Sequence, residues 1–499
     1  MDFRRLLKHT LVYGSGVWTG KLIGFVMIPV YTRVLTPSDY GVLELISRVT
    51  DVIALVLGMG LAAALIRFHA EAKTDKQRAR VANTAIAFAG AIGLAAAIVL
   101  GASSNAISGL MFSSARYALC VRLALIAMGM ELCTVAPLAL LRIHERSALF
   151  AALGLGRLLA ALSLNIYLVV LLRMGVLGLM ISNLIGVSLV MAVLIAAVGR
   201  SWRPRLDRRL LRAMLAYSLP LVPCSFAMFV LNFGDRFFLR AYCGLEVLGV
   251  YSLGYKLCMV MPGLVMEPIG LAWSAVVFTL ADRDDAPRLY ARYFHAFMFC
   301  VAFFSLWLSA ISRDLIAVMA DQSYWEAYRV VPVVMLGLCA WGASNVFETG
   351  ILLSKKTYFR TIGHLSAAAV VTAAYLLLIP RYGQMGAAWA TVAGFGAMAA
   401  GTYAFSQRLY RIPYDLRRGL LLLGVAAGLY AISRLVPGVG PVLIVPRTLV
   451  VLALPVVLYE AGYFDKEDTS ALAAIIRSVF SRASAECRSV VASCKGSVL

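Results

Sequence analysis

Residues 176–198 read VLGLMISNLIGVSLVMAVLIAAV, and no charged side chain interrupts them. The next segment, residues 199–213, reads GRSWRPRLDRRLLRA and carries six arginines. A helix rises about 1.5 Å per residue, so the first run is long enough to cross the roughly 30 Å hydrocarbon core of a bilayer. The arginines that follow are typical of a cytoplasmic link. Together the two segments predict a chain that spans a membrane.

The composition of the whole chain agrees with this prediction. Of its 499 residues, 62% are hydrophobic and 14% are charged, against roughly 45–50% and 25% in soluble domains. The net charge of +21 would suggest nucleic acid as a partner of a soluble protein. Here the basic residues lie in the links between apolar runs, so we expect no nucleic-acid partner. The nine cysteines form no C-x-x-C pair and no Cys/His tract, so we expect neither a metal site nor a disulfide framework.

Apolar windows of about 20 residues predict about 14 transmembrane helices. They lie near residues 9–33, 40–67, 82–101, 117–141, 148–172, 176–198, 214–238, 247–276, 290–312, 328–352, 359–379, 385–406, 416–434 and 442–462. The first apolar stretch is too long for a signal peptide and no small-residue cleavage site ends it, so we interpret it as a span.

The links alternate in charge. Links 68–81 and 199–213 are basic, whereas links 102–114 and 437–441 contain no Lys or Arg. This asymmetry predicts a multi-pass protein of the inner (cytoplasmic) membrane with both termini in the cytoplasm. The tail at 465–499 has apolar residues at helical spacing, which suits either an amphipathic helix on the membrane surface or a solvated tail.

An internal repeat divides the chain. The motif Arg-x-Gly-x-x-Gly at 173–178 recurs 208 residues later at 381–386, and a looser echo joins Gly41 to Gly249. Six spans are an even number, so two such halves enter the membrane in the same orientation. The alternative is that the motif is a common pattern of outer turns.

The repeat predicts an all-α fold of two six-helix bundles, related by a pseudo-two-fold axis along the membrane normal, plus two extra helices. The predicted parts are the N-terminal bundle 1–200, the C-terminal bundle 201–410, two additional transmembrane helices at 411–464 and the tail 465–499.

Basic residues inside the spans are candidates for a binding site, because a charge in hydrocarbon is costly and usually faces a wet cavity or a partner. The candidate cavity cations are Lys21, Arg48, Arg122, Arg157 and Lys256. Such cations suit the phosphates of a polyanionic head group. Arg48 shares a helix face with Glu44 and Asp51, so a structural ion-pair cluster is the alternative there. For Arg122 the alternative is snorkelling to the outer interface.

Acidic residues and a histidine inside the spans are candidates for ion coupling or for ion pairs. They are Glu44, Asp51, Glu131, Glu267, Glu348 and His364. Binding of H⁺ or Na⁺ at such groups would couple transport to an ion gradient, whereas pairing with cations would be structural. We expect no other cofactor.

The sequence carries no enzyme signature. It has no Walker A loop, no G-x-S-x-G elbow and no H-E-x-x-H motif, and its longest link between spans has about 15 residues, short for a catalytic domain. We therefore expect a transporter and not an enzyme.

Two segments resemble the polysaccharide-biosynthesis (Wzx-like) flippases of the multidrug/oligosaccharidyl-lipid/polysaccharide exporter superfamily. They are the first hairpin, residues 6–14 with 29–41, and Asp235-Arg236 with residues 248–252. The resemblance implies alternating access by a flippase that moves undecaprenyl-pyrophosphate-linked oligosaccharide from the cytoplasmic to the periplasmic leaflet. The product would be O-antigen (lipopolysaccharide), capsule or exopolysaccharide.

The same resemblance implies that Lys21, Arg48 and Lys256 lie near the cations of the cavity. The implied partners are lipid-linked oligosaccharide, membrane lipid, and the polymerase and chain-length proteins of the pathway.

Three other hypotheses stay open. An ion-coupled multidrug exporter of the same superfamily would favour acidic and aromatic cavity residues, and the Lys/Arg excess in the spans argues against it. A membrane-embedded glycan polymerase or transferase would need larger loops. A non-transporting partner in polysaccharide export is the third.

Overall fold

The computed structural model describes residues 27–198 and 205–464, and every regular element in them is helical. In this part of the chain, eleven helical segments are long and apolar enough to cross a membrane. Two of them, Arg208–Ser274 and Tyr358–Leu409, continue through a glycine with non-helical backbone, Gly244 (φ 89°) and Gly383 (φ 55°). The predicted all-α membrane fold is confirmed. The count of 14 stays a prediction, because most of the first span lies outside the described residues.

The first half of the chain forms one group of helices. They are α2 (Ile28–Val34), α3 (Pro37–Gly58), α4 (Leu61–Glu71), α5 (Asp75–Ala102), α6 (Ser104–Phe112), α7 (Ala118–Ile143), α8 (Ser147–Asn165), the π-helix η2 (Ile166–Leu171) and α9 (Gly175–Val198). Capping boxes start α3 at Thr36 and α5 at Thr74. Each threonine side chain accepts a hydrogen bond from the backbone N–H three residues later, and the side chain of that later residue accepts one from the backbone N–H of the threonine. Helix α6 lies in a link that the sequence did not predict to be helical.

The second half forms another group and ends in a hairpin. Its helices are α10 (Arg208–Ser218), α11 (Val222–Phe233), α12 (Asp235–Cys258), the π-helix η4 (Pro262–Met266), α13 (Glu267–Val276), α14 (Ala286–Met319), the 3₁₀ helix η5 (Gln322–Arg329), α15 (Val331–Phe347), α16 (Thr349–Leu353), α17 (Tyr358–Leu409), α18 (Leu416–Leu435), α19 (Ile444–Leu452) and α20 (Leu454–Glu460).

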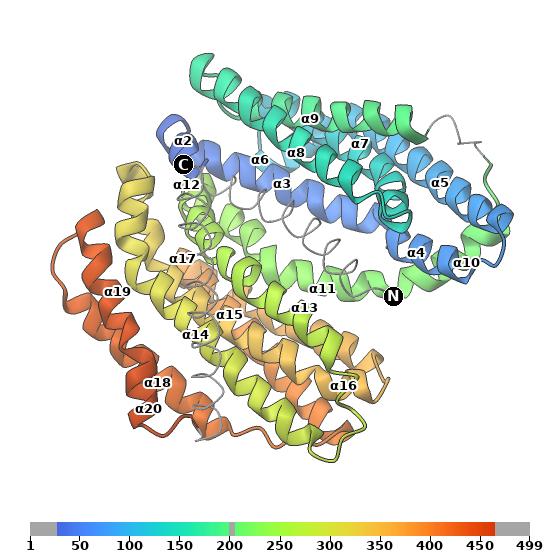
Figure 1. Cartoon of the computed structure of the whole chain (residues 1–499). Coiled ribbons are helices and arrows are strands. Elements are labelled where there is room, and N and C mark those ends of the chain that lie inside the picture. Colours follow the sequence, from blue (N-terminus) through green and yellow to red (C-terminus); the bar gives the residue numbers. More distant parts are fainter. Residues whose placement is uncertain (1–26, 199–204, 465–499) are drawn as a thin grey trace, which may run out of the picture.

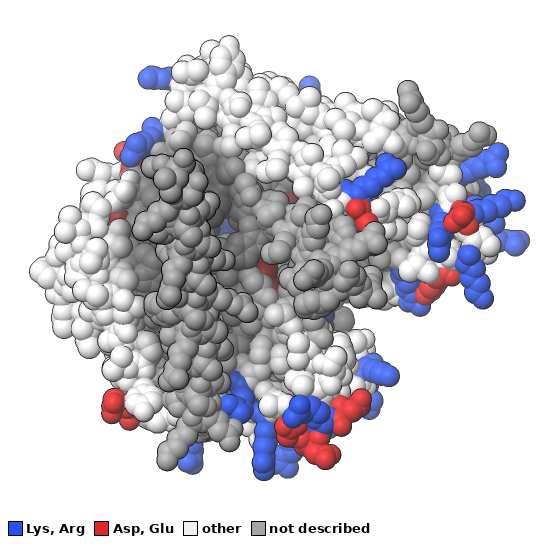
Figure 2. Space-filling model, in the orientation of Figure 1, with Lys and Arg blue, Asp and Glu red and all other residues white. Residues whose placement is uncertain are grey.

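The two groups of helices diverge from a common contact (Figure 1). Helices α3 and α12 lie side by side where the groups meet, and the groups separate toward the end that carries α4 and α10 on one side and α16 on the other. Figure 2 shows most of the visible charge at that divergent end. The domain boundaries stay predictions, as does the assignment of the tail 465–499, which lies outside the described residues.

Two glycines permit the contact between α3 and α12. A methyl group on Gly41 would overlap the carbonyl oxygen of Leu245, and one on Gly249 would overlap that of Pro37. Small residues allow helix backbones to approach this closely within a membrane. These two glycines are separated by the same 208 residues as the Arg-x-Gly-x-x-Gly motifs.

The first glycine of each copy of the motif has a positive φ. Gly175 has φ 58° and Gly383 has φ 55°, values that glycine adopts at little cost. These features agree with an internal repeat, and the pseudo-two-fold axis itself stays a prediction.

Candidate polar site between the two helix groups

An ion-pair network occupies the face of α3 that meets α12. Arg48 Nε lies 3.2 Å from Glu44 Oε1, and Arg48 Nη1 lies 2.8 Å from Asp51 Oδ2. The guanidinium also stacks on Phe233 of α11, with its carbon 4.3 Å from the ring centre. The prediction that these three charged residues share one helix face is therefore confirmed. Arg48 forms the ion pairs with Glu44 and Asp51 that were predicted as the alternative to substrate binding.

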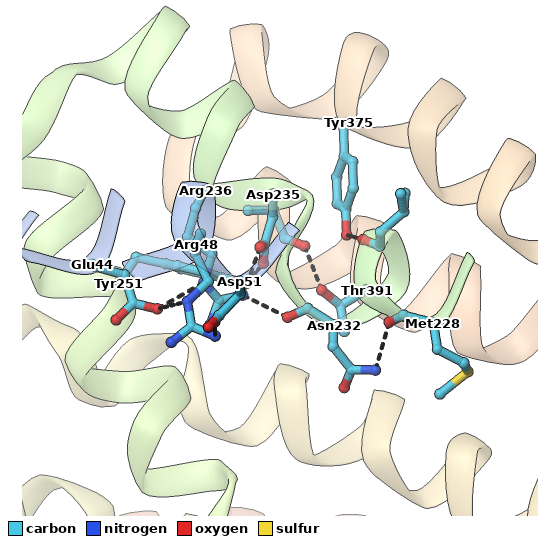
Figure 3. Close-up of polar contacts among 12 residues, drawn as sticks. Glu44, Arg48, Asp51, Met228, Asn232, Asp235, Arg236, Tyr251, Tyr375 and Thr391 are labelled. Atoms are coloured by element: carbon cyan, nitrogen blue, oxygen red, sulfur yellow. Dashed lines mark hydrogen bonds and ion pairs between the residues drawn. The ribbon is translucent and has the colours of Figure 1, made fainter. Parts of the chain in front are cut away.

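A second arginine enters this network from α12. Arg236 is 2% exposed, and its Nη1 lies 2.6 Å from Asp235 Oδ1 and donates to the backbone oxygen of Asn232 at 2.7 Å. Its Nε lies 3.5 Å from Glu44 Oε1, so Glu44 is shared by two arginines. Figure 3 shows Glu44, Arg48 and Asp51 beside Arg236 and Asp235, at the junction of α3 and α12.

Two tyrosines complete the buried part of this network, one through its hydroxyl and one through its ring. The hydroxyl of Tyr251 donates to Asp235, and the guanidinium of Arg236 lies 4.0 Å from the ring centre of Tyr255. Buried charge is tolerated when it is paired and hydrogen-bonded. We infer that Arg236 and Asp235 hold α12 against α3. Neither residue was among the site residues predicted from the sequence, although two opposite charges at the end of a predicted apolar span indicate a buried ion pair.

Lys256 differs from the two arginines. Its side chain is exposed, while its neighbours Tyr255 and Leu257 are buried at 0% and 3% exposure. The ammonium lies 5.9 Å from the ring centre of Tyr40. Among the described residues no carboxylate lies within ion-pair distance of Lys256, but its ammonium group interacts with the hydroxyl of Tyr40 and with the charge of Glu44. It is therefore a cation of this region without a close carboxylate partner.

The meeting point of the two groups is closed by further contacts. The hydroxyl of Tyr324 donates to the backbone oxygen of Leu35 at 2.9 Å, and Thr32 donates to that of Met319 at 3.1 Å. Both bonds join the first half of the chain to the second. The two groups are thus joined at the end of α2, α3 and η5, and their helices separate toward the end that the sequence predicts as cytoplasmic.

Other candidates lie in separate places. Arg157 of α8 pairs with Glu131 of α7 and donates to Asn183 of α9 at 3.1 Å, all within the first helix group. Arg122 is exposed and donates to Ser104 of α6 at 3.0 Å. The structure thus does not bring Arg122 or Arg157 into the network at α3. Lys21 lies outside the described residues.

The remaining acidic candidates lie in the second helix group. Glu348 contacts His364 and Arg360, at 3.0 Å and 3.1 Å. Glu267 is an exposed residue at the start of α13. Among the described residues, no three His, Cys, Asp or Glu side chains are grouped so that they could hold a metal ion.

Comparison with known proteins gives a family and a fold. The sequence model of a family described as "Polysaccharide biosynthesis protein" matches residues 6–275. No curated protein sequence matches the chain. Among solved structures, the chain is similar to the lipid II flippase MurJ in an inward closed conformation, with a TM-score of 0.75 and 12% identity over 90% of this chain and 99% of that one.

Two further structures share the fold. An inward-facing multidrug resistance MATE transporter of the MOP superfamily has a TM-score of 0.58 and 15% identity over 80% of this chain and 94% of that one. A MOP superfamily transporter from Pyrococcus furiosus has a TM-score of 0.52 and 13% identity over 82% and 96%. At these identities the likeness establishes the fold, which is that of flippases and transporters and not of enzymes.

Proposed function

Since the chain belongs to the polysaccharide biosynthesis protein family, we propose that it is a flippase for undecaprenyl-pyrophosphate-linked oligosaccharide. It would move this lipid from the cytoplasmic to the periplasmic leaflet of the inner membrane, for the synthesis of O-antigen, capsule or exopolysaccharide. The flippase-like transporter fold and the family membership support the class of protein. The substrate is inferred from the positive charge that Lys256 places between the two helix groups.

One observation carries the proposal: Lys256 offers an exposed ammonium group between the two helix groups, which among the described residues interacts with Tyr40 and Glu44 but has no carboxylate within ion-pair distance. A lysine ammonium is a point charge that suits phosphate oxygens. The same charge would repel a cationic drug, which argues against multidrug export. In this proposal Arg48 and Arg236, already paired with carboxylates, maintain the shape of the site, and Lys256 contacts the pyrophosphate.

The shape of the molecule suits loading from the predicted cytoplasmic side. The two helix groups separate toward the end that carries α4, α10 and α16, and at the opposite end they meet in the α3–α12 contact. A head group would enter from the wide end while its prenyl chain stays in lipid. Rocking of the two groups about their contact would then expose Lys256 to the other side.

The test is complementation of a deletion strain. Wild type, Lys256→Ala, Arg48→Ala and the double variant are expressed at matched levels, with Lys355→Ala in the link after α16 as the control. We expect loss of surface glycan and accumulation of lipid-linked oligosaccharide in the inner leaflet for Lys256→Ala and for the double variant. Normal glycan in the uncomplemented deletion strain would contradict the proposal.

A further inference from the structure

A buried polar chain joins three helix segments of the second group, away from the network at α3. Cys224 of α11 has its Sγ 3.1 Å from His364 Nδ1, and His364 Nε2 lies 3.0 Å from Glu348 Oε1. Glu348 follows α15, and His364 is on α17. His364 and Glu348 are 2% and 5% exposed.

One further charge completes this chain. Arg360, one turn before His364 on α17, lies 3.1 Å from Glu348 Oε2 and is 46% exposed. The titratable and charged groups that face the imidazole are therefore Cys224 from α11, Glu348 from the end of α15 and Arg360 from its own helix. Arg360 also lies at the start of α17, beside the link 354–357 that joins α16 to α17.

The neutral imidazole satisfies every bond in this chain. Nε2–H donates to Glu348, Nδ1 accepts from the thiol of Cys224, and the charges of Glu348 and Arg360 cancel. A proton added at Nδ1 turns this nitrogen into a donor, so the thiol can no longer donate to it. The cluster then carries one net positive charge inside a membrane span, which is costly unless water or an anion reaches it. The two protonation states thus favour different distances between α11 and α17.

Helix α11 extends from this cluster to the candidate substrate site. Its first turn contains Cys224, and its last residue, Phe233, stacks on Arg48 of α3. The segment before it is bent at the 3₁₀ turn Leu219–Leu221, with prolines at 220 and 223. A bent segment can take up a small displacement of α11 relative to α17. Movement at Cys224 would therefore reach the contact between the two helix groups.

We propose that Cys224, His364 and Glu348 form a proton-binding site, and that uptake of one proton at His364 loosens α11 from α17 and so couples the transport cycle to a proton gradient. This inference rests on the transport function proposed above and identifies its coupling ion and coupling site. The proton goes to Nδ1 of His364, Glu348 keeps its bond to Nε2, and the bond that the thiol donated is replaced by a weaker one, because the sulfur of Cys224 is a weak acceptor of Nδ1–H.

The first test measures the site itself and needs no substrate. Membranes with the full-length protein are treated with N-ethylmaleimide at a series of pH values, and alkylation of Cys224 is followed by peptide mass spectrometry. Cys300 of α14 is exposed and serves as the reference thiol in the same molecule. The ratio of the two rates should change at least about threefold between pH 5 and 10, a range that includes the titration of an ordinary histidine and of one that is hydrogen-bonded to a carboxylate. In His364→Gln the ratio should stay constant.

The second test measures coupling. His364→Gln and Glu348→Gln are compared in the deletion strain with His295→Gln, a substitution of another histidine in a span. We expect glycan export to fall to the empty-vector level in the first two variants and to stay normal in the third. Cys224→Ser, which keeps a hydroxyl donor, should retain export.

The outcomes are distinguishable. A constant rate ratio in wild type would overturn the proton site, whatever the export result. A pH-dependent ratio with normal export in His364→Gln would overturn the coupling role and leave the flippase function standing. Normal glycan in the deletion strain would overturn the proposed function together with the coupling role.

Discussion

Arg447 of α19 and Asp314 of α14 form an ion pair in which the two side chains are 2% and 0% exposed. The other oxygen of Asp314 accepts the backbone N–H of Gly440 at 3.0 Å, and Arg447 donates to the backbone oxygen of Gly438 at 2.9 Å. This pair therefore secures the hairpin between α18 and α19 to α14.

Breaking this pair should destabilise the protein. Arg447→Met leaves the carboxylate of Asp314 buried without its cation, at an expected cost of about 3–5 kcal/mol. The measurement is the thermal unfolding midpoint in detergent. Arg447→Met combined with Asp314→Asn should recover part of the loss, and Arg283→Met, in an exposed ion pair, should leave the midpoint unchanged. An unchanged midpoint in Arg447→Met would show that the pair contributes nothing.

Alanine at either contact glycine should also destabilise the protein. Gly41→Ala or Gly249→Ala forces apart α3 and α12, and overpacking of this kind costs about 1–3 kcal/mol. Gly424→Ala in α18 is the matched control, because nothing lies within 4 Å of its added methyl group. The thermal midpoint should fall in the first two variants and stay equal or rise in the third. The same response in all three would mean that the α3–α12 contact is not close.

Asp207 should make the stability of the end that carries α4 and α10 depend on pH. Its carboxylate accepts the backbone N–H of Leu210 at the start of α10 and pairs with Arg80 of α5, and these contacts lower its pKa. A lowered pKa in the folded state gives stability that is present above the unfolded value of about 3.9 and is lost as the pH falls through the folded value. The difference in thermal midpoint between wild type and Asp207→Asn should thus be present at pH 7 and shrink below about pH 4. A difference that is independent of pH would contradict this role.

Substitutions of Lys256 should show whether glycan export depends on the positive charge of this side chain or on its size. Lys256→Arg keeps the cation and should keep most glycan export. Lys256→Gln should reduce export about 10- to 100-fold, as expected for the loss of a charged hydrogen bond worth about 1.5–3 kcal/mol. Lys256→Glu should abolish export. Protein levels of the variants are matched by immunoblot. Equal export in the glutamine and arginine variants would mean that the charge of Lys256 does not bind substrate.

The predicted spans agree with the structure wherever the hydrophobic pattern is strong. The span predicted at 176–198 is α9, Gly175–Val198, because an uninterrupted apolar run leaves few alternatives in a bilayer. The pattern could not show how tight the turns at Gly244 and Gly383 are, where a single glycine with non-helical backbone separates two helices. Backbone geometry at one residue leaves little trace in a window of about 20 residues.

The site could be predicted only in part. The spacing of Glu44, Arg48 and Asp51 placed them on one face, because helical periodicity is local. The sequence could not show that Arg236 shares Glu44 with Arg48, since this contact depends on how α12 packs on α3. Nor could it show that Arg157 is paired with Glu131 within the first helix group. Contacts between distant segments require the tertiary structure.

The position of the two contact glycines makes α3 a lever with its fulcrum at one end. Gly41 lies in the second turn of the helix, and the last residue, Gly58, is about 26 Å further along the axis. Each degree of rotation about the glycine contact would therefore carry the far end of α3 through about 0.5 Å. A small angular change between the two backbones at this contact is therefore amplified at the end where the two helix groups separate.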